Sequence, residues 1–169
     1  MAKKAPKGTR SGAAGTPATV ALAREGIAFE ARSYAHDPAE TDFGGEAARE
    51  LGIPAERVYK TLLVEIDGAL AVGVVPVSGM LDLKAMAAAR GGKRAVMADP
   101  AVAERKTGYV VGGISPLGQR TRLPTVIDDS ARSHATVLVS GGRRGLDIEL
   151  APEDLARACF ATWARIGRA

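Results

Sequence analysis

The sequence predicts an α+β fold built on a mixed, strongly curved sheet with surrounding helices. Two runs rich in β-branched residues, VYKTLLVEI and ALAVGVVPV, are joined by Asp67-Gly68, a dipeptide typical of a tight β-hairpin. Helical and strand-like patterns follow one another without the strict alternation of a parallel βαβ fold. Neither a repeat nor an interdomain linker interrupts them, so the length of 169 residues predicts one domain over residues 16–169.

Helices are predicted where capping residues bracket an apolar pattern. TPATVALAREG has Thr16 as a plausible N-cap, a proline at the first helical position and Gly26 as its stop. Its expected buried stripe is Val20, Ala23 and Ile27. Three more helices are predicted in GEAARELG, LDLKAMAAARGG and DPAVAERKTG, each ended by glycine.

Further strands are predicted from short runs bounded by turn residues. IAFEARSY alternates only in part, which favours an edge strand, and TGYVV, TVIDD, TVLVSGG and LDIEL complete the set. The C-terminal APEDLARACFATWARIGR places Leu155, Cys159, Trp163 and Ile166 on one helical face. This spacing predicts a long closing helix.

The excess positive charge is confined to the N-terminus. Residues 1–15 hold four of the 23 Lys and Arg residues and no acid, so the remainder carries 19 basic and 19 acidic residues. The tail has no apolar run and is predicted to be disordered. A solvated, incidental tail is the favoured interpretation, and a contact with RNA phosphates is the alternative.

Several functional classes are disfavoured by what the chain lacks. It has no apolar run suited to a signal peptide or a membrane span, and its single cysteine fits a reducing cytoplasm. His36 and His134 lie at no metal-ligand spacing, and neither a phosphate-binding loop nor GXGXXG is present, so we expect no metal and no nucleotide cofactor. Cys159 lies on an apolar stripe away from any histidine and is interpreted as a core residue.

Two glycine-rich segments are the strongest functional signals. VGGISPLGQRTR, from Val111 to Arg122, exposes backbone N–H groups of the kind that stabilise a developing oxyanion. VSGGRRGLDIEL adds the hydroxyl of Ser140 and the carboxylate of Asp147. Ser140 has no GXSXG frame and no evident His–Asp pair, so we expect it to form hydrogen bonds rather than to attack.

Lys60 is a charge inside a strand-like run. Alternation places it on one face with Val58, Leu62 and Val64, where it either extends along the surface at a sheet edge or points into a pocket. A buried ammonium needs a counter-charge, and Asp147 is the expected partner.

These motifs, together with YXHDPXXTXFG, LDLK, MADP and RLPTXID, resemble the YbaK/EbsC family, particularly its Cys-tRNA(Pro) deacylases. The similarity runs from about Thr16 to the C-terminus. It implies a barrel-like α+β domain, similar to the editing domains inserted in some prolyl-tRNA synthetases. The GGISPLG form resembles the cysteine-clearing branch.

The resemblance also implies a set of site residues. Lys60 and Gly112 take the catalytic positions. The substrate-binding positions are Tyr34, Phe43, Thr61, Gly113, Ser140 and Asp147. No cofactor and no metal are implied, and the partners are the cysteine-carrying acceptor end of tRNA(Pro) and prolyl-tRNA synthetase, in the cytoplasm with no membrane contact.

The chemistry implied by the family explains why a nucleophile is missing. The thiol of the substrate attacks its own carbonyl and leaves as a cyclic thiolactone, while the protein positions the ester. Three alternatives stay open: deacylation of alanine or serine from a mischarged tRNA, a non-catalytic module that binds an aminoacyl group or nucleotide, and a hydrolase of small esters. The sequence predicts no oligomeric state.

Overall fold

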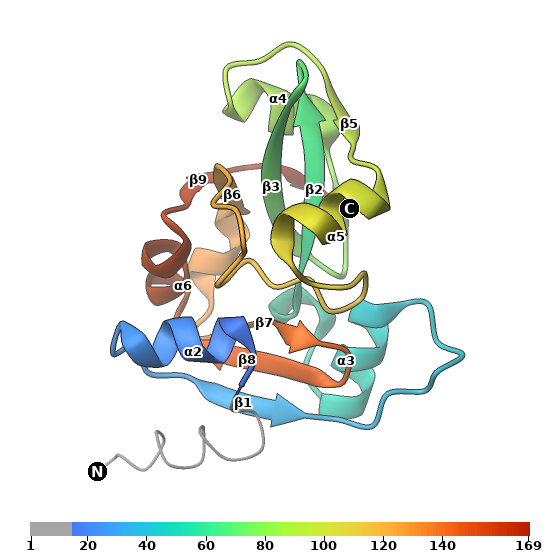
Figure 1. The fold of residues 1–169 in the computed structure, drawn as a ribbon, viewed down its shortest axis with the longest axis vertical. Helices are drawn as coiled ribbons and strands as arrows, with labels where there is room; N and C mark the ends of the chain where they lie inside the picture. Colours follow the sequence, from blue (N-terminus) through green and yellow to red (C-terminus); the bar gives the residue numbers. More distant parts are fainter. Residues whose placement is uncertain (1–14) are drawn as a thin grey trace.

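The computed structural model describes residues 15–169, which form an α+β domain (Figure 1). The predicted disordered tail therefore lies outside the described residues, except for Gly15. The α+β class and the mixed order of helices and strands agree with the sequence prediction. None of the helices formed by residues 15–169 has the length and apolar character that crossing a bilayer requires.

The largest sheet has five strands and mixes both pairing directions. Its order is β5 (Ala95–Met97), β2 (Tyr59–Ile66), β3 (Ala69–Pro76), β6 (Thr125–Asp128) and β9 (Thr162–Ala164). The first three strands pair antiparallel, whereas β6 and β9 join parallel. The predicted hairpin turn is present, with Asp67 at φ 51° and Gly68 at φ 90°, both positive as a type I′ turn requires.

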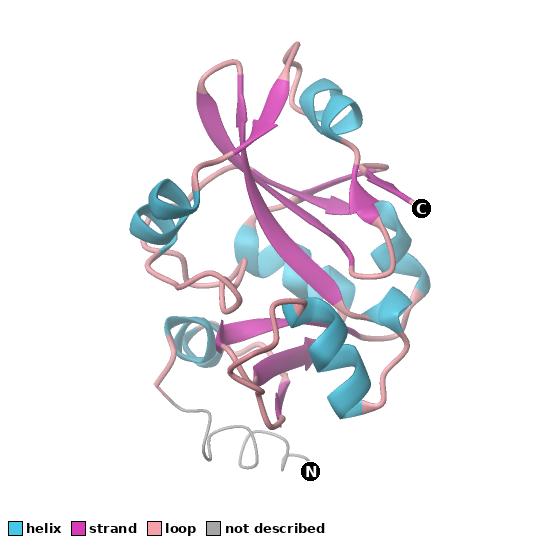
Figure 2. Cartoon of the chain, turned by 90° about the vertical axis from the view of Figure 1, so that its right-hand side faces the viewer, coloured by secondary structure: helices cyan, strands magenta, loops and turns pink. Residues whose placement is uncertain are grey.

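A second sheet packs at the base of this hairpin. It contains β1 (Glu30–Ser33), β8 (Leu146–Leu150) and β7 (Val137–Arg143), all antiparallel, with β1 at the edge as predicted. A parallel bridge from Val58 to Leu138 joins the two sheets. In Figures 1 and 2 the long β2–β3 hairpin rises from this lower sheet.

The predicted barrel-like sheet is not confirmed. A third, two-stranded sheet pairs β4 (Met80–Leu81) with β10 (Gly167–Arg168), and none of the three sheets formed by residues 15–169 closes on itself. The strands are divided among three sheets and do not form a single curved one. Among residues 15–169, the isolated β-bridge between Val58 and Leu138 links the two larger sheets.

The helices cover the outer faces of these sheets. They are α2 (Pro17–Arg24), α3 (Phe43–Leu51), α4 (Leu83–Ala89), α5 (Pro100–Thr107) and α6 (Pro152–Cys159), with the 3₁₀ turns η1 (Ala55–Arg57) and η2 (Asp129–Ser133). Side-chain oxygens of Thr16, Asp42, Asp82 and Asp99 cap α2 to α5. Left-handed Gly52 and Gly108 end α3 and α5 as predicted.

Two helix predictions were wrong in detail. Helix α2 buries Ala18, Thr19 and Leu22, while Val20 and Ala23 are exposed, so its buried face is rotated from the predicted stripe; Ile27, beyond the end of the helix, is buried as predicted. The predicted long C-terminal helix stops at Cys159, where Phe160 takes a left-handed φ of 53°. Trp163, which was expected on that helix, instead lies in strand β9. There it pairs with Ile127 of β6, so that β9 covers the edge of β6.

One predicted strand is a loop. TGYVV follows directly on α5, and its Tyr109 is buried with the phenol donating to the Leu117 carbonyl at 2.6 Å. The Glu104 carboxylate accepts the Val111 N–H at 2.8 Å. The segment therefore forms hydrogen bonds within its own loop and with α5, and not with a neighbouring strand.

Asp128 anchors the C-terminal strand. Its carboxylate accepts the N–H groups of Ile166 at 2.9 Å and Gly167 at 2.7 Å, and both the N–H and hydroxyl of Ser130 donate to it. Burial alone would raise the pKa of this carboxyl, which is only 5% exposed, but the hydrogen bonds from Ser130, Gly167 and Ile166 lower it below its ordinary value. The charged form is therefore part of the folded structure.

Asp128→Asn is expected to lower the free energy of unfolding by about 2 kcal/mol at neutral pH, because one accepting oxygen becomes a donor. The carboxylate pKa is lowered in the folded state. Its contribution is thus present above the unfolded value of about 3.9 and is lost as the pH falls through the folded value. Urea unfolding at pH 7 and pH 3 measures both effects. The exposed neighbour variant Asp129→Asn is the control, and an equal loss there would contradict the assignment.

Candidate active site

One pocket of about 360 Å³ lies where the first half of β2 meets β7, β8 and α5. It brings together seven of the eight site residues predicted from the sequence: Tyr34, Phe43, Lys60, Thr61, Gly112, Ser140 and Asp147. They come from the ends of β1 and α5, the start of α3, and strands β2, β7 and β8. Apolar side chains such as Leu63, Ala103 and Ile114 complete the wall.

Lys60 lines the pocket, which is compatible with the second of the two predicted possibilities. It is the second residue of β2 and is partly buried opposite Val75 of β3. Among residues 15–169, no carboxylate forms an ion pair with it. The predicted Lys60–Asp147 pair is therefore absent, although both side chains line the same pocket. The ammonium is held in the wall and remains available to an anionic or polar group of a substrate.

Asp147 is the most unusual group of the pocket. It is 5% exposed and lies opposite Ser140 of β7 in the second sheet. No hydrogen bond from the described residues compensates its burial, which raises the pKa of its carboxyl to about 7. Burial and the nearby Asp147 charge also raise the pKa of the Tyr34 phenol to about 12, so Tyr34 stays a neutral donor.

The hydroxyl groups differ in how far they are satisfied. The Oγ of Ser140 accepts the Gly142 N–H at 3.2 Å within the bulge that ends β7. Thr61 Oγ1 is buried in the pocket wall and, within residues 15–169, has no hydrogen-bond partner. A buried hydroxyl left unpaired costs free energy, and a substrate that bonds to it recovers that cost.

The glycine loop leaves one amide free beside the pocket. Val111 donates its N–H to Glu104, and Gly113 donates its own to the Val110 carbonyl at 2.8 Å. Between them, the Gly112 N–H has no acceptor in the part of the chain that the structure describes. Gly113 does not line the pocket, because its backbone packs against Arg143 and Arg144, so its predicted substrate contact stays a prediction.

Gly112 also has no room for a side chain. Its φ is +91°, and a Cβ there would lie 2.8 Å from Arg144 Nε and 2.9 Å from the Phe43 ring. Glycine is therefore required twice, by the backbone conformation and by the close approach of two side chains.

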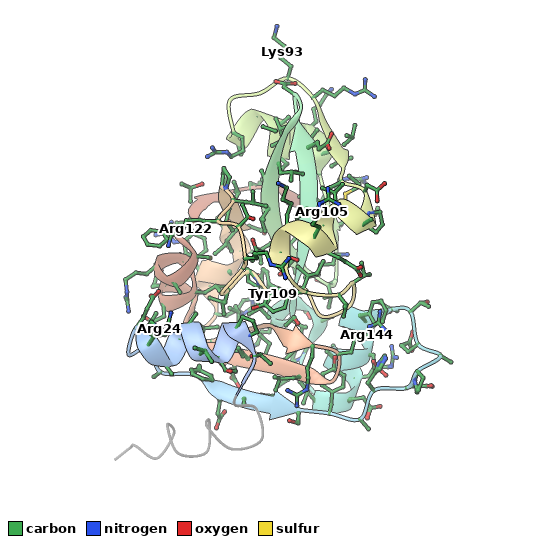
Figure 3. The ribbon with its side chains drawn as sticks, viewed as in Figure 1. Arg24, Lys93, Arg105, Tyr109, Arg122 and Arg144 are labelled. Carbon is green, nitrogen blue, oxygen red and sulfur yellow. The ribbon has the colours of Figure 1, made fainter. Side chains whose placement is uncertain are left out.

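Arg144 is a site residue that sequence reasoning missed. Its guanidinium donates from Nε and Nη2 to the Val111 carbonyl, at 2.9 and 2.7 Å, and lies 4.9 Å from the Phe43 ring centroid. Figure 3 shows it between the loop and α3. One side chain thus fixes the glycine loop to α3, yet an arginine in a turn is ordinarily an exposed charge and gave no signal.

A buried carboxylate fixes the polar loop before α3. Glu46, 3% exposed, accepts from His36 Nδ1 and from the Asp37 N–H, each at 2.7 Å. Burial alone would raise the Glu46 pKa, but these hydrogen bonds lower it below its ordinary value. His36 itself lies 6.0 Å from the Phe43 ring and does not line the pocket, so it supports Phe43 from behind.

The polar side chains among the described residues of the pocket wall are hydroxyls, an ammonium and carboxylates. No cysteine or histidine is among the described residues that line it. Cys159 is buried elsewhere, where burial raises the pKa of its thiol to about 12, as expected for a core residue. Within residues 15–169, no group of three or more His, Cys, Asp or Glu side chains could hold a metal ion.

An α+β domain whose described pocket residues offer an ammonium, a free amide, hydroxyls and a carboxylate, but no thiol or imidazole, is suited to positioning a substrate that is already activated. Residues 38–158 match the family model of the aminoacyl-tRNA editing domain. The chain belongs to this family, and its substrates are of the activated kind, since an aminoacyl-tRNA is an ester.

Two groups of relatives support this assignment. EbsC of Enterococcus faecalis (strain ATCC 700802 / V583), named as a candidate Cys-tRNA(Pro)/Cys-tRNA(Cys) deacylase, is 38% identical over 70% of this chain and 73% of its own. Among solved structures, a candidate trans-editing enzyme for prolyl-tRNA synthetase has a TM-score of 0.80 at 24% identity, covering 90% of this chain and 96% of its own. The hypothetical protein APE2540 has a TM-score of 0.77 at 26% identity, covering 87% and 96%. The structural likeness confirms the fold.

Gly112→Ala is expected to lower kcat/KM for aminoacyl-tRNA deacylation at least ten-fold, because the added methyl displaces Phe43 or Arg144 at the pocket wall. Gly68→Ala is the matched control: Gly68 has φ +90°, but nothing lies within 4 Å of its Cβ position. Both variants should lose about 1–2 kcal/mol of unfolding free energy through the same backbone strain. Equal activities of the two variants would remove the loop from the site.

Asp147→Asn is expected to stabilise the fold above pH 7 by roughly 2–4 kcal/mol while reducing activity. In the folded state the pKa is raised to about 7, against about 3.9 when unfolded. The native state therefore holds a proton that the unfolded chain lacks, and wild-type stability falls as pH rises through this window. Chemical unfolding between pH 4 and 8 should show the variant's gain vanishing near pH 4. A gain independent of pH, or a loss like that of Asp128→Asn, would contradict an uncompensated carboxylate.

Proposed function

We propose that this protein removes cysteine from mischarged tRNA(Pro), acting as a free-standing editing enzyme in the cytoplasm. The observation that carries the proposal is the pocket in which Lys60, Thr61, Gly112 and Asp147 converge without a thiol or imidazole. Membership of the aminoacyl-tRNA editing family supports an aminoacyl ester as substrate. The name of the relative from Enterococcus faecalis supports cysteine as the amino acid.

In the proposed reaction the substrate supplies the nucleophile. The cysteine sulfur forms a bond to its own carbonyl carbon, and the acyl–oxygen bond to the ribose breaks. The proton of the thiol ends on the ribose oxygen, which leaves as the hydroxyl of the tRNA, and the amino acid departs as a thiolactone that water opens. No atom of the protein forms a covalent bond, which agrees with a pocket free of attacking groups.

The pocket supplies electrostatic stabilisation for this step. The unpaired Gly112 N–H is available to the carbonyl oxygen as negative charge develops on it. The Lys60 ammonium, without a carboxylate partner among residues 15–169, is available to the ribose oxygen or the terminal phosphate. In this proposal the Gly112 N–H and the Lys60 ammonium both stabilise negative charge on the substrate, either charge already present or charge that develops during the reaction.

Asp147 and Ser140 are assigned to the α-amino group of the substrate. They are direct neighbours across β7 and β8, and Asp147 has no cation of its own among residues 15–169. The absence of a Lys60–Asp147 pair favours this role over orienting Lys60. A substrate ammonium would provide the missing counter-charge and lower the carboxyl pKa again. Thr61 belongs to the same pocket wall, and its buried Oγ1 has no hydrogen-bond partner among residues 15–169.

Selectivity follows from the chemistry of the substrate. Serine is almost the same size as cysteine, but its hydroxyl is a far weaker nucleophile at neutral pH. A pocket of about 360 Å³ admits both. Rejection of serine thus requires no steric exclusion.

Wild-type protein is expected to release cysteine from Cys-tRNA(Pro) and to leave Ser-tRNA(Pro) and Ala-tRNA(Pro) largely intact. Lys60→Ala should lower kcat/KM for the cysteine ester about 100-fold with an unchanged melting temperature, as for loss of one preorganised electrostatic contact. Lys84→Ala, which removes an exposed lysine of α4, is the control. Deacylation is followed with 3′-labelled tRNA, with and without prolyl-tRNA synthetase.

The outcomes separate the remaining hypotheses. Preferential release of alanine or serine would replace the cysteine assignment with another editing specificity. Tight binding of aminoacyl-tRNA without turnover would indicate a non-catalytic module, and hydrolysis of free amino-acid esters would indicate a small-ester hydrolase. An undiminished rate in Lys60→Ala would remove Lys60 from its assigned role.

A further inference from the structure

The segment that forms one wall of the pocket is itself strongly basic. From Arg105 to Arg122 the chain carries four cations and no Asp or Glu. Val111, Gly112 and Ile114, in the middle of this segment, line the pocket. Residues 16–169 contain equal numbers of basic and acidic residues, so the excess of positive charge in this segment, next to the pocket, is a local feature.

The two ends of the segment are held together. Arg120 donates its N–H to the Thr107 carbonyl at 2.9 Å, and Thr121 donates to the Lys106 carbonyl at 3.0 Å. Nη1 of Arg120 also reaches the Arg105 carbonyl at 3.3 Å. The segment is therefore a closed loop with the pocket lining at its tip and with Arg105, Lys106 and Arg120 at its base. We call these three residues the loop-base surface.

The charges of the loop-base surface are not compensated. Arg105 and Arg120 are exposed and Lys106 is half-buried, and none of the three forms an ion pair with a carboxylate of residues 15–169. The nearest acid in the sequence, Glu104, is turned to the Val111 N–H. By contrast, Arg32 of β1 and Arg57 of η1 share Glu149 of β8. Adjacent like charges repel, and a bound polyanion relieves that repulsion.

We propose that the loop-base surface binds the phosphate backbone of the tRNA acceptor arm while the loop tip receives the aminoacyl end. This inference rests on the proposed function for the identity of the RNA. Helix α5 connects the two regions: Pro100 and Ala103 line the pocket, and Arg105 and Lys106 follow in its last turn, about 3–5 Å beyond Ala103 along the axis. Arg122, whose guanidinium lies 4.0 Å from the exposed Phe160 ring, extends the surface away from the pocket.

A second basic cluster provides the matched control. Arg90, Lys93 and Arg94 are also two arginines and one lysine, all exposed, at the loop between α4 and β5. Figure 3 shows Lys93 at the far end of the molecule and Arg105 beside α5 at its middle. This second cluster has a carboxylate beside it, since Asp67 accepts the backbone N–H groups of Lys93 and Arg94. It lies beyond the hairpin turn and away from the pocket residues of β2.

The test compares full-length wild type with two triple variants, Arg105→Gln/Lys106→Gln/Arg120→Gln and Arg90→Gln/Lys93→Gln/Arg94→Gln. Binding of uncharged tRNA(Pro) and of its acceptor-arm minihelix is measured by fluorescence anisotropy from 50 to 300 mM salt. The loop-base variant is expected to raise Kd about ten-fold at low salt and to reduce the slope of log K against log salt by about two. The control variant, Arg90→Gln/Lys93→Gln/Arg94→Gln, should bind with a Kd within two-fold of that of wild type. Deacylation by the loop-base variant should fall through a higher KM.

Because uncharged RNA is the probe, this result does not depend on turnover. Wild type that binds tRNA through the loop base but releases no amino acid would overturn the proposed function and leave the RNA surface standing. Equal losses in both variants, unchanged binding in the loop-base variant, or no binding by wild type at 50 mM salt would each overturn the inference. A loop-base defect seen only when prolyl-tRNA synthetase is present would also overturn it, by assigning the surface to a protein contact.

Discussion

The site depends on an uneven compensation of buried polar groups. Asp128 and Asp147 are equally buried, each 5% exposed, yet their pKa values move in opposite directions. Asp128 is surrounded by donors and stabilises the fold, whereas Asp147 has no donor among residues 15–169 and costs stability as an anion. The same contrast holds between Glu46, which His36 and Asp37 satisfy, and Thr61, whose hydroxyl is unpaired among the described residues. Asp128 and Glu46, which do not line the pocket, are saturated, whereas Asp147 and Thr61, which do, have no hydrogen-bond partner among residues 15–169.

The saturated groups hold the wall in place. Glu46 ties the polar loop to α3, and Arg144 ties α3 to the glycine loop through the Val111 carbonyl and the Phe43 ring. Because Gly112 has no side chain, Phe43 and Arg144 can approach its backbone to within contact distance. A free amide can be positioned to stabilise an oxyanion only if its neighbours are already bonded, and Glu104 and Val110 provide those bonds.

Local signals made much of the fold predictable, and long-range pairing made the rest unpredictable. Capping residues and Asp67-Gly68 act over a few positions, so the helix ends and the hairpin follow from the sequence. The C-terminal helix was overpredicted because the spacing of Leu155, Cys159, Trp163 and Ile166 fits a helix, while the open edge of β6 pairs with Trp163 as a strand. Lys60, Ser140 and Asp147 could be named because polar groups are costly inside a core, and Gly112 because of its turn-rich segment, whereas Tyr34, Phe43 and Thr61 were named from the family resemblance. Arg144 could not, since its importance lies in where the turn places it.

A pocket that leaves the chemical step to its substrate faces different demands from one that contains a nucleophile. None of the described residues that line this pocket is a histidine or a cysteine. In the proposed reaction, discrimination between amino acids depends on whether a bound ester can reach the reactive geometry by itself, which adds a chemical filter to size. The uncompensated Asp147 favours the same outcome, because the stability it costs is recovered only when a cation occupies the pocket. An aminoacyl ester brings that cation on the same small fragment as the reacting carbonyl, so binding of the amine and alignment of the ester are one event.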